Sequence, residues 1–210
     1  MSTPALMIGS SCGGQVSIPN LLKKINLNEI ITLICPHIRQ EAIKSEIERI
    51  GLKLEKTDKI SMFETGKIYD VSRQFIYSHS GKGMMTGDKE SPGLIKEMSL
   101  YVNLTNKGLN MPGPIDKQMG VASEIYKENL IGVILSGKGK DGAKGIKIIE
   151  QQGGVTFAQR YELKETLYDG TSLYCDEMPT AAKNAGAQFY MNLSDISEKI
   201  NTIVKDKLNF

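Results

Sequence analysis

The sequence predicts a doubly wound α/β domain, in which a mostly parallel sheet carries helices on both faces and a β-hairpin at one edge. Runs that are apolar on both faces are typical of buried parallel strands. Such runs, rich in β-branched and aliphatic residues, occupy positions 5–10, 29–35, 130–137 and 153–159. Each of the first three is followed by a loop and then by a segment with helical periodicity. This alternation of strands and helices predicts a parallel sheet.

The helices are predicted from apolar residues spaced three or four positions apart. The three helices that follow strands are marked by Ile18, Leu21, Leu22 and Ile25, by Ile43, Ile47 and Ile50, and by Ala143, Ile146 and Ile149. In the first of these, Pro19 is expected near the start, where a helix tolerates proline. Two further helices are marked by Ile115, Met119, Ala122 and Ile125, starting near Pro114, and by Ile196, Ile200 and Ile203, preceded by the start signal Ser194-Asp195.

Residues 63–89 have a different character. Short alternating runs are broken there by Asp, Ser and Gly. This pattern predicts one or two β-hairpins at the edge of the sheet. No linker separates this region from the rest, so we expect residues 1–210 to form a single domain.

Composition excludes several classes of protein. The formal net charge of +2 argues against broad nucleic-acid binding, which needs a clustered basic face. The cysteines Cys12, Cys35 and Cys175 are odd in number and lack CxxC spacing, which argues against a disulfide framework or a zinc site and fits a reducing cytosol. No apolar run approaches membrane-spanning length, and the N-terminus lacks the pattern of a secretory signal. We therefore expect a cytoplasmic protein that does not insert into membranes.

Residues with catalytic potential follow three of the predicted strands. Ligands of open α/β sheets bind outside the carboxyl ends of the strands. The loop after the first strand holds Ser10, Ser11 and Cys12, the second holds His37, and the third holds Asp141. A serine, a histidine and an aspartate are the nucleophile, base and orienting carboxylate of a catalytic triad. Glycines beside the serine would let a substrate carbonyl approach, and helix-start N–H groups could hold an oxyanion.

Other interpretations of these loops stay open. Asp141 could simply cap the helix that follows it. The stretch 137–142 also matches GxGxxG between a strand and a helix, the pattern of a dinucleotide site. Against that interpretation, Asp141 would place a carboxylate against the pyrophosphate, and the next strand ends at Gln159 rather than at an acidic residue. The second histidine, His79, lies in the hairpin region and is expected to be exposed.

Four stretches together resemble the catalytic domain of the chemotaxis receptor methylesterases. They are IGSSCGG near the N-terminus, the PH of LICPHI, GVILSGKGKDGAKGIKIIEQQGGVTFAQ, and EMPTAAKNAGA at 177–187. The family's corresponding stretches read like IGASTGG, a strand ending QHMP, GVILTGMGxDGAxG with a later GG and IAQ, and GMPRAAIEAGA. The resemblance covers most of the chain and is strong over 132–159, good at 8–14 and loose in the hairpin region.

The resemblance implies an enzyme that hydrolyses glutamyl methyl esters on chemoreceptors, with deamidation of receptor glutamines as a second activity in many members. It implies that Ser11 is the nucleophile, His37 the base and Asp141 the residue that orients it, with backbone amides at Cys12 and Lys138 facing the oxyanion. Cys12 replaces the family's usual Thr, and Lys138 its usual Met. The expected partners are the cytoplasmic helices of methyl-accepting chemoreceptors, and no cofactor or metal is implied.

The resemblance also sets expectations about the whole molecule. The chain starts at the first catalytic strand, so we expect a stand-alone catalytic domain without the family's receiver domain, and a monomer. The segment 160–177 is longer than expected of the family. It leaves the sheet at the same edge as the three loops, so it is either a flap that borders the substrate groove or a solvated loop with no role. A non-catalytic protein or a nucleotide-binding enzyme of the same fold is the alternative.

Overall fold

The computed structural model describes residues 4–38, 42–55, 60–62, 69–70, 75–77, 85–87, 94–97, 113–161 and 174–208. The elements, in chain order, are β1 Ala5–Ser10, α1 Gly14–Leu22, β2 Ile31–Pro36, α2 Ile43–Leu54, β3 Ile60–Met62, β4 Tyr69–Asp70, β5 Phe75–Tyr77, β6 Met85–Gly87, β7 Leu94–Glu97, α4 Pro114–Tyr126, the 3-10 turn η3 Lys127–Asn129, β8 Leu130–Ile134, α5 Ala143–Gln151, β9 Val155–Gln159, α6 Glu177–Asn184, β10 Phe189–Met191 and α7 Leu193–Leu208.

The main sheet is parallel. Within the described ranges it has seven strands in the order β10-β9-β8-β1-β2-β5-β3, and each recorded pairing runs parallel. The first strand, β1, pairs with β2 on one side and with β8 on the other. The chain therefore winds outwards in both directions from β1. This reversal point is where open α/β sheets place their ligand sites.

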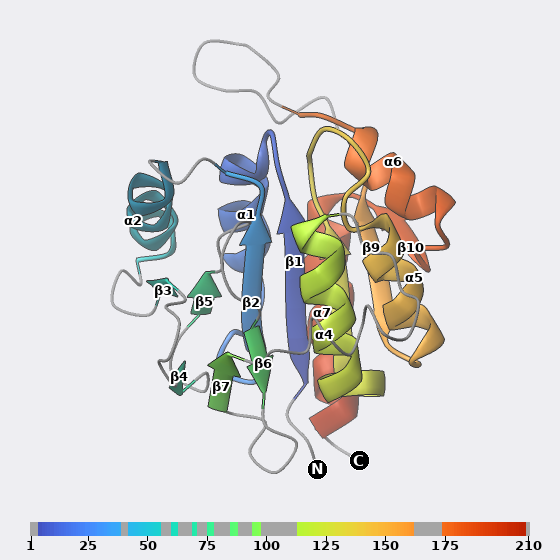
Figure 1. The fold of residues 1–210 in the computed structure, drawn as a ribbon. Helices are drawn as coiled ribbons and strands as arrows, with labels where there is room; N and C mark the ends of the chain where they lie inside the picture. The colour runs from blue at the N-terminus through green and yellow to red at the C-terminus, as the bar shows by residue number, and fades with distance from the viewer. Residues whose placement is uncertain are drawn as a thin grey trace.

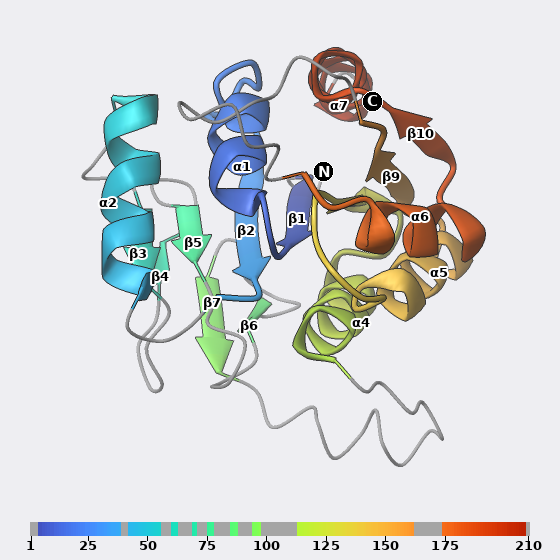
Figure 2. The ribbon, with the colours of Figure 1, turned by 90° about the horizontal axis from the view of Figure 1, so that it is seen from above.

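Helices cover both faces of the sheet (Figures 1 and 2). Helices α1, α2 and α7 pack on one face, in a core that includes Leu6, Ile8 and Phe157. Helices α4, α5 and α6 pack on the other face, around Ala5 and Met7. Neighbouring residues of β1 thus point to opposite faces and both are buried, which explains why the strand is apolar throughout.

The predicted fold class is confirmed, and the predicted strands and helices are present with small shifts at their ends. One correction concerns Pro19, which lies in the interior of α1 rather than near its start. The helix begins earlier than expected because Gly13, in the left-handed conformation with φ 87°, turns the chain directly from the serine loop into Gly14. Ile25 lies beyond the end of α1 but still packs in the core with it.

The region predicted as edge hairpins also needs a correction. Strand β5 joins the main sheet in parallel, between β2 and β3. Antiparallel pairing does occur, but β6 and β7 form it with β4 in a second sheet of three strands among the described residues. The three residues of β5, Phe-Ile-Tyr, are too few to show whether a strand lies inside a parallel sheet or in an edge hairpin.

Two elements near the C-terminus were not predicted. The stretch quoted above as EMPTAAKNAGA contains α6, and β10 follows as the last strand of the sheet. Among the described helices, none combines the length and the apolar character needed to cross a bilayer.

Removing the ring of Phe157 should destabilise the fold strongly. This side chain is fully buried and stacks on Phe189 with ring centroids 5.1 Å apart. Phe157→Ala should lower the free energy of unfolding by about 3–5 kcal/mol in urea titrations, because a large buried side chain leaves a cavity. Leu52→Ala is the control: Leu52 is 70% exposed, and its loss should change stability by less than about 0.5 kcal/mol.

Candidate active site

Three strand ends meet at the reversal point of the sheet. Ser11 follows β1, His37 follows β2, and the loop 135–142 follows β8. Backbone hydrogen bonds join these ends: the His37 N–H donates to the Ser10 carbonyl at 2.7 Å, and the Ser11 N–H donates to the Ser136 carbonyl at 2.9 Å. The parallel register of β1 with its two neighbours therefore brings the predicted serine, histidine and aspartate to one edge.

The structure distinguishes the two serines of the first loop. Ser10 is the last residue of β1 and is fully buried, with its hydroxyl directed against Gly14, where a Cβ atom would overlap it. Ser11 lies one residue beyond the strand, is half-buried and lines an open groove. Only the second hydroxyl is placed to meet a substrate.

His37 contacts the predicted aspartate directly. Its Nε2 atom lies 2.5 Å from Oδ2 of Asp141, and the side chains are 36% and 10% exposed. An imidazole has two nitrogens, and a carboxylate bound to one of them fixes the ring orientation and tautomer while the other exchanges a proton with a nucleophile. The histidine is thus open to the groove, whereas its partner is shielded from solvent.

The carboxylate of Asp141 is held by backbone N–H groups at the start of α4. Ile115 donates to Oδ2 and Asp116 to Oδ1, both at 3.0 Å, and Gly142 donates to Oδ1 at 2.9 Å. Burial alone would raise the pKa of Asp141. The hydrogen bonds from His37, Asp116 and Ile115 outweigh it, so this pKa lies below its ordinary value of 3.8. The residue therefore caps a helix and contacts the histidine at the same time, and the capped helix is α4 rather than the one that follows.

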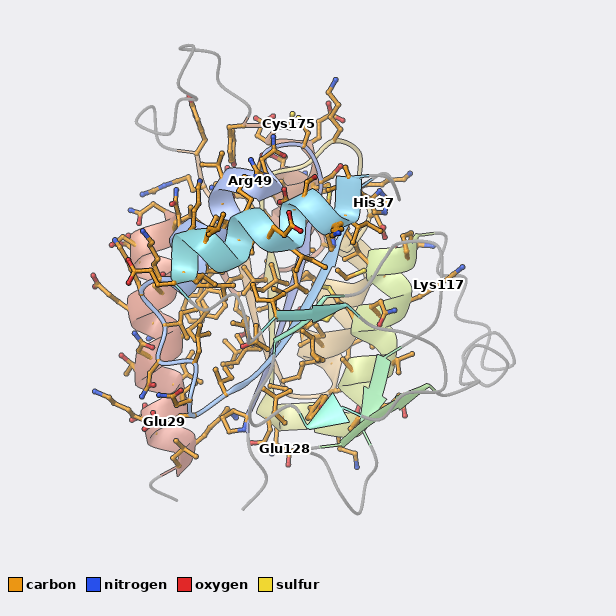
Figure 3. The ribbon with its side chains drawn as sticks, turned by 90° about the vertical axis from the view of Figure 1, so that its left-hand side faces the viewer. Glu29, His37, Arg49, Lys117, Glu128 and Cys175 are labelled. Carbon is orange, nitrogen blue, oxygen red and sulfur yellow. The ribbon has the colours of Figure 1, made fainter. Side chains whose placement is uncertain are left out.

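A groove runs beside Ser11 and His37. Helix α2 supplies one wall, and the described lining includes Ser11, Cys12, Gln15, His37, Glu46 and Arg49. Its volume of about 1260 Å³ exceeds the range of about 300–1,000 Å³ that is usual for small-molecule pockets. Glu46 is buried and forms an ion pair with Arg49 on the same helix. Figure 3 shows His37, Arg49 and Cys175 at one end of the molecule, with Glu29 and Glu128 at the other.

The fold itself explains why glycine occupies two positions of the loop 137–142. A Cβ at Gly137 would lie 2.9 Å from the Cβ of Ser11, so this position must be small for the loop to approach the serine. Gly142 adopts φ +92° as it starts α5. These constraints account for two positions of the GxGxxG pattern without a dinucleotide. Lys138 is exposed in the same loop, next to Gly137, and Cys12 lines the groove beside Ser11.

Ser136 and Asp116 were missed from the sequence. The Ser136 hydroxyl donates to the Cys12 carbonyl at 2.6 Å and accepts the Cys175 N–H at 2.8 Å, which ties the serine loop to the segment before α6. Asp116 is buried at the start of α4. A serine at a strand end and an acidic residue in a first helical turn are common, so neither residue carries a distinctive signal.

The thiol of Cys175, which shares a hydrogen bond with Cys12, does not have the character of a reactive cysteine. Burial, together with a hydrogen bond to Cys12, raises the pKa of Cys175 to about 11. A thiol with such a pKa stays protonated at neutral pH and is a poor nucleophile.

Of the other predicted features, His79 and residues 162–173 of the expected flap lie outside the described residues.

The lowered pKa of Asp141 predicts a pH-dependent contribution to stability. A carboxyl with a depressed native pKa stabilises the fold fully above its unfolded value, and this stabilisation is lost as the pH falls through the native pKa. Asp141→Asn should therefore destabilise the protein more at pH 7 than at pH 3 in urea titrations. Ser197→Ala removes a buried non-titrating hydroxyl and should cost the same at both pH values. A pH-independent difference for Asp141→Asn would contradict the described hydrogen bonding.

Comparison with known proteins agrees with this geometry. Residues 6–200 match the family described as CheB methylesterase. A protein-glutamate methylesterase/protein-glutamine glutaminase of Thermotoga maritima is 30% identical over 166 residues, which are 77% of this chain and 45% of the relative. One from Carboxydothermus hydrogenoformans is 25% identical over 201 residues, 93% of this chain and 54% of the relative. The chain thus spans about half the length of these relatives.

A solved structure gives the same result for the fold. The crystal structure of the Thermotoga maritima CheB methylesterase catalytic domain superimposes with a TM-score of 0.72 at 24% identity, covering 97% of this chain and all of that one. The family match extends from β1 into α7 and includes Ser11, His37 and Asp141. This chain belongs to the CheB methylesterase family.

Proposed function

We propose that this protein is a serine esterase that hydrolyses glutamyl methyl esters on the cytoplasmic helices of chemoreceptors. The proposal rests on one observation above all: Ser11 and His37 line the same groove, and Asp141 holds the histidine from behind. Family membership supports it, since the relatives named above are protein-glutamate methylesterases/protein-glutamine glutaminases.

The proposed reaction follows the triad chemistry of serine hydrolases. His37 takes the proton of the Ser11 hydroxyl as the oxygen attacks the ester carbonyl, and the ionised Asp141 stabilises the imidazolium that forms. The imidazolium then protonates the departing methoxide, so that methanol leaves and a glutamyl ester on Ser11 remains. A water molecule, deprotonated by His37, hydrolyses this acyl-enzyme and releases the glutamate carboxylate. The low pKa of Asp141 suits this role, because the carboxylate stays charged at neutral pH.

The developing oxyanion needs hydrogen-bond donors. We assign this role to the backbone N–H groups of Cys12 and Lys138, which flank Ser11 from the first and third loops. A backbone donor does not depend on the side chain, so the presence of Cys and Lys at these positions is compatible with activity. Each such donor contributes on the order of 100- to 1,000-fold in rate.

The shape of the groove supports a protein substrate. It is open and bounded on one side by α2, so an ester side chain can reach Ser11 while its own backbone stays outside. The same groove would admit a glutamine side chain, with ammonia leaving in place of methanol. We propose a cytoplasmic, monomeric catalytic domain of residues 1–210 that acts without a cofactor and does not bind nucleic acid.

Loss of the nucleophile or the base should abolish activity. Ser11→Ala and His37→Ala should each lower kcat/KM for p-nitrophenyl acetate and for a methylated chemoreceptor by on the order of a thousandfold or more, since members of a triad act as a unit. A fluorophosphonate probe should label Ser11, as located by peptide mass spectrometry.

Cys12→Ser and His79→Ala are the matched controls and should retain most of the activity. Inactivation by iodoacetamide at Cys12, combined with an active Ser11→Ala variant, would show that the thiol is the nucleophile. Equal damage from the two histidine variants would contradict the assigned base.

A second test concerns the space that the Asp141 carboxylate occupies. A Cβ at Gly113 would overlap this carboxylate, whereas the backbone at Gly113, with φ −108° and ψ 157°, suits any residue. Gly113→Ala should therefore lower kcat by on the order of 10- to 100-fold through displacement of Asp141. In an Asp141→Ala background the same substitution should have little further effect. An unchanged kcat for the single variant would show that the carboxylate has room to move without losing His37.

A further inference from the structure

Helices α4 and α5, whose first residues lie at Asp141, lack capping side chains of their own. The N-cap residues of α4 and α5 are Gly113 and Gly142, and neither provides a side-chain hydrogen bond. The first N–H groups of a helix need acceptors, particularly when they are buried. Helices α4 and α5 lie side by side (Figures 1 and 2), and each receives its acceptor from the chain of the other.

The exchange of carboxylates is reciprocal. Asp141, immediately before the N-cap of α5, accepts the N–H groups of Ile115 and Asp116 at the start of α4. Asp116, in the first turn of α4, accepts the N–H of Gly145 in the first turn of α5 at 2.9 Å through Oδ1. We call this arrangement the reciprocal cap. Each carboxylate thus satisfies donors of the helix to which it does not belong.

Helices α4 and α5 pack very closely where these hydrogen bonds form. A Cβ at Gly145 would lie only 2.5 Å from the Cβ of Met119, so α5 approaches α4 as closely as a glycine allows. Asp116 is 1% exposed and has no solvent to stabilise it. Burial and the charge of Asp141 raise the pKa of Asp116, while the N–H groups of Gly145, Gly142 and Lys144 oppose this effect.

Placing the carboxylates of Asp116 and Asp141 close together in the interior lowers the stability of the fold, unless other interactions offset it. Burying a charge is unfavourable unless it is paired or hydrogen-bonded, and like charges repel. A serine or asparagine at each N-cap would satisfy the helix donors without that cost. The reciprocal cap differs from such local caps in one respect: it fixes the position of residue 141 relative to α4, and hence relative to His37.

We propose that Asp116 is a positioning residue of the esterase site, which acts on the reaction through Asp141. The inference rests on the proposed function, because positioning has meaning only if Asp141 orients His37 in catalysis. By holding the first turn of α5, Asp116 keeps the preceding residues 141–142 in place, and the Asp141 carboxylate stays both on the α4 donors and on the imidazole.

Steady-state kinetics on the full chain tests this role. Asp116→Ala should lower kcat for p-nitrophenyl acetate by on the order of 10- to 100-fold, the range expected when a catalytic group shifts by about 1 Å. KM should change less than about twofold, since Asp116 does not line the groove. Asp116→Asn retains one oxygen acceptor and should recover part of the loss; it also serves if the alanine variant does not fold. In an Asp141→Ala background, Asp116→Ala should change kcat less than about twofold.

Asp195→Ala is the matched control. Asp195 also lies in the first turn of a helix, α7, where it is exposed and bonded to Asn192. Its loss removes a helix-start carboxylate away from the triad and should leave kcat unchanged. An Asp116→Ala variant with wild-type kcat, or a loss that multiplies with that of Asp141→Ala, would overturn the positioning role.

Amide hydrogen exchange gives a readout that does not depend on activity. Asp116→Ala should speed exchange at Ile115, a donor to Asp141, and Asp141→Ala should speed exchange at Gly145, a donor to Asp116. Absence of this cross effect, in a protein whose activity depends on Ser11, would overturn the positioning role alone. A cross effect in a protein without Ser11-dependent activity would overturn the proposed function and leave Asp116 with a purely structural part.

Discussion

The carboxylate of Asp141 is the point on which the site depends. It accepts hydrogen bonds from three backbone N–H groups and contacts the imidazole of His37. An aspartate that faced only a histidine would need solvent to satisfy its other lone pairs, and water would compete for the ring. Here backbone N–H groups at the start of α4 and of Gly142 take that role, so the carboxylate is shielded from solvent and fixed in orientation.

The contact between Asp141 and His37 depends on the strand order and the parallel direction of the sheet. His37 and Asp141 follow strands that lie on opposite sides of β1, and they meet in front of its carboxyl end because both neighbours run parallel to it. Helix α4 leads into β8 and packs on the sheet face opposite α1, which puts its first turn at the same edge. Ser136 closes the arrangement by joining the carbonyl of Cys12 to the amide of Cys175. These loops are thus held mainly by backbone groups, whose positions the sheet determines.

Much of the fold and of the candidate site could be predicted from the sequence, and the features that could not be predicted have physical reasons. Apolar runs and helical periodicity located β1, β2, β8, β9 and the helices between them, because burial on both faces leaves a strong pattern. The three residues proposed as the triad could be predicted because loops after parallel strands share one edge. The short strands β4–β7 could not be placed, since pairing partners of two to four residues leave no periodicity. Asp116 escaped notice because an acidic residue in a first helical turn normally serves its own helix, and its use by a neighbour depends on tertiary packing.

The separation in sequence between Asp116 and Asp141, the two residues of the reciprocal cap, has a consequence during synthesis of the chain. Asp141 lies 25 residues beyond Asp116, so α4 leaves the ribosome before the group that completes its first turn. A helix of this length is marginal by itself in water. Its first N–H groups therefore lack their acceptor until β8 and the following loop have been synthesised. A chain that stops before residue 141 contains the serine and the histidine but lacks the carboxylate that both caps α4 and contacts His37, so neither interaction can form until that residue has been synthesised.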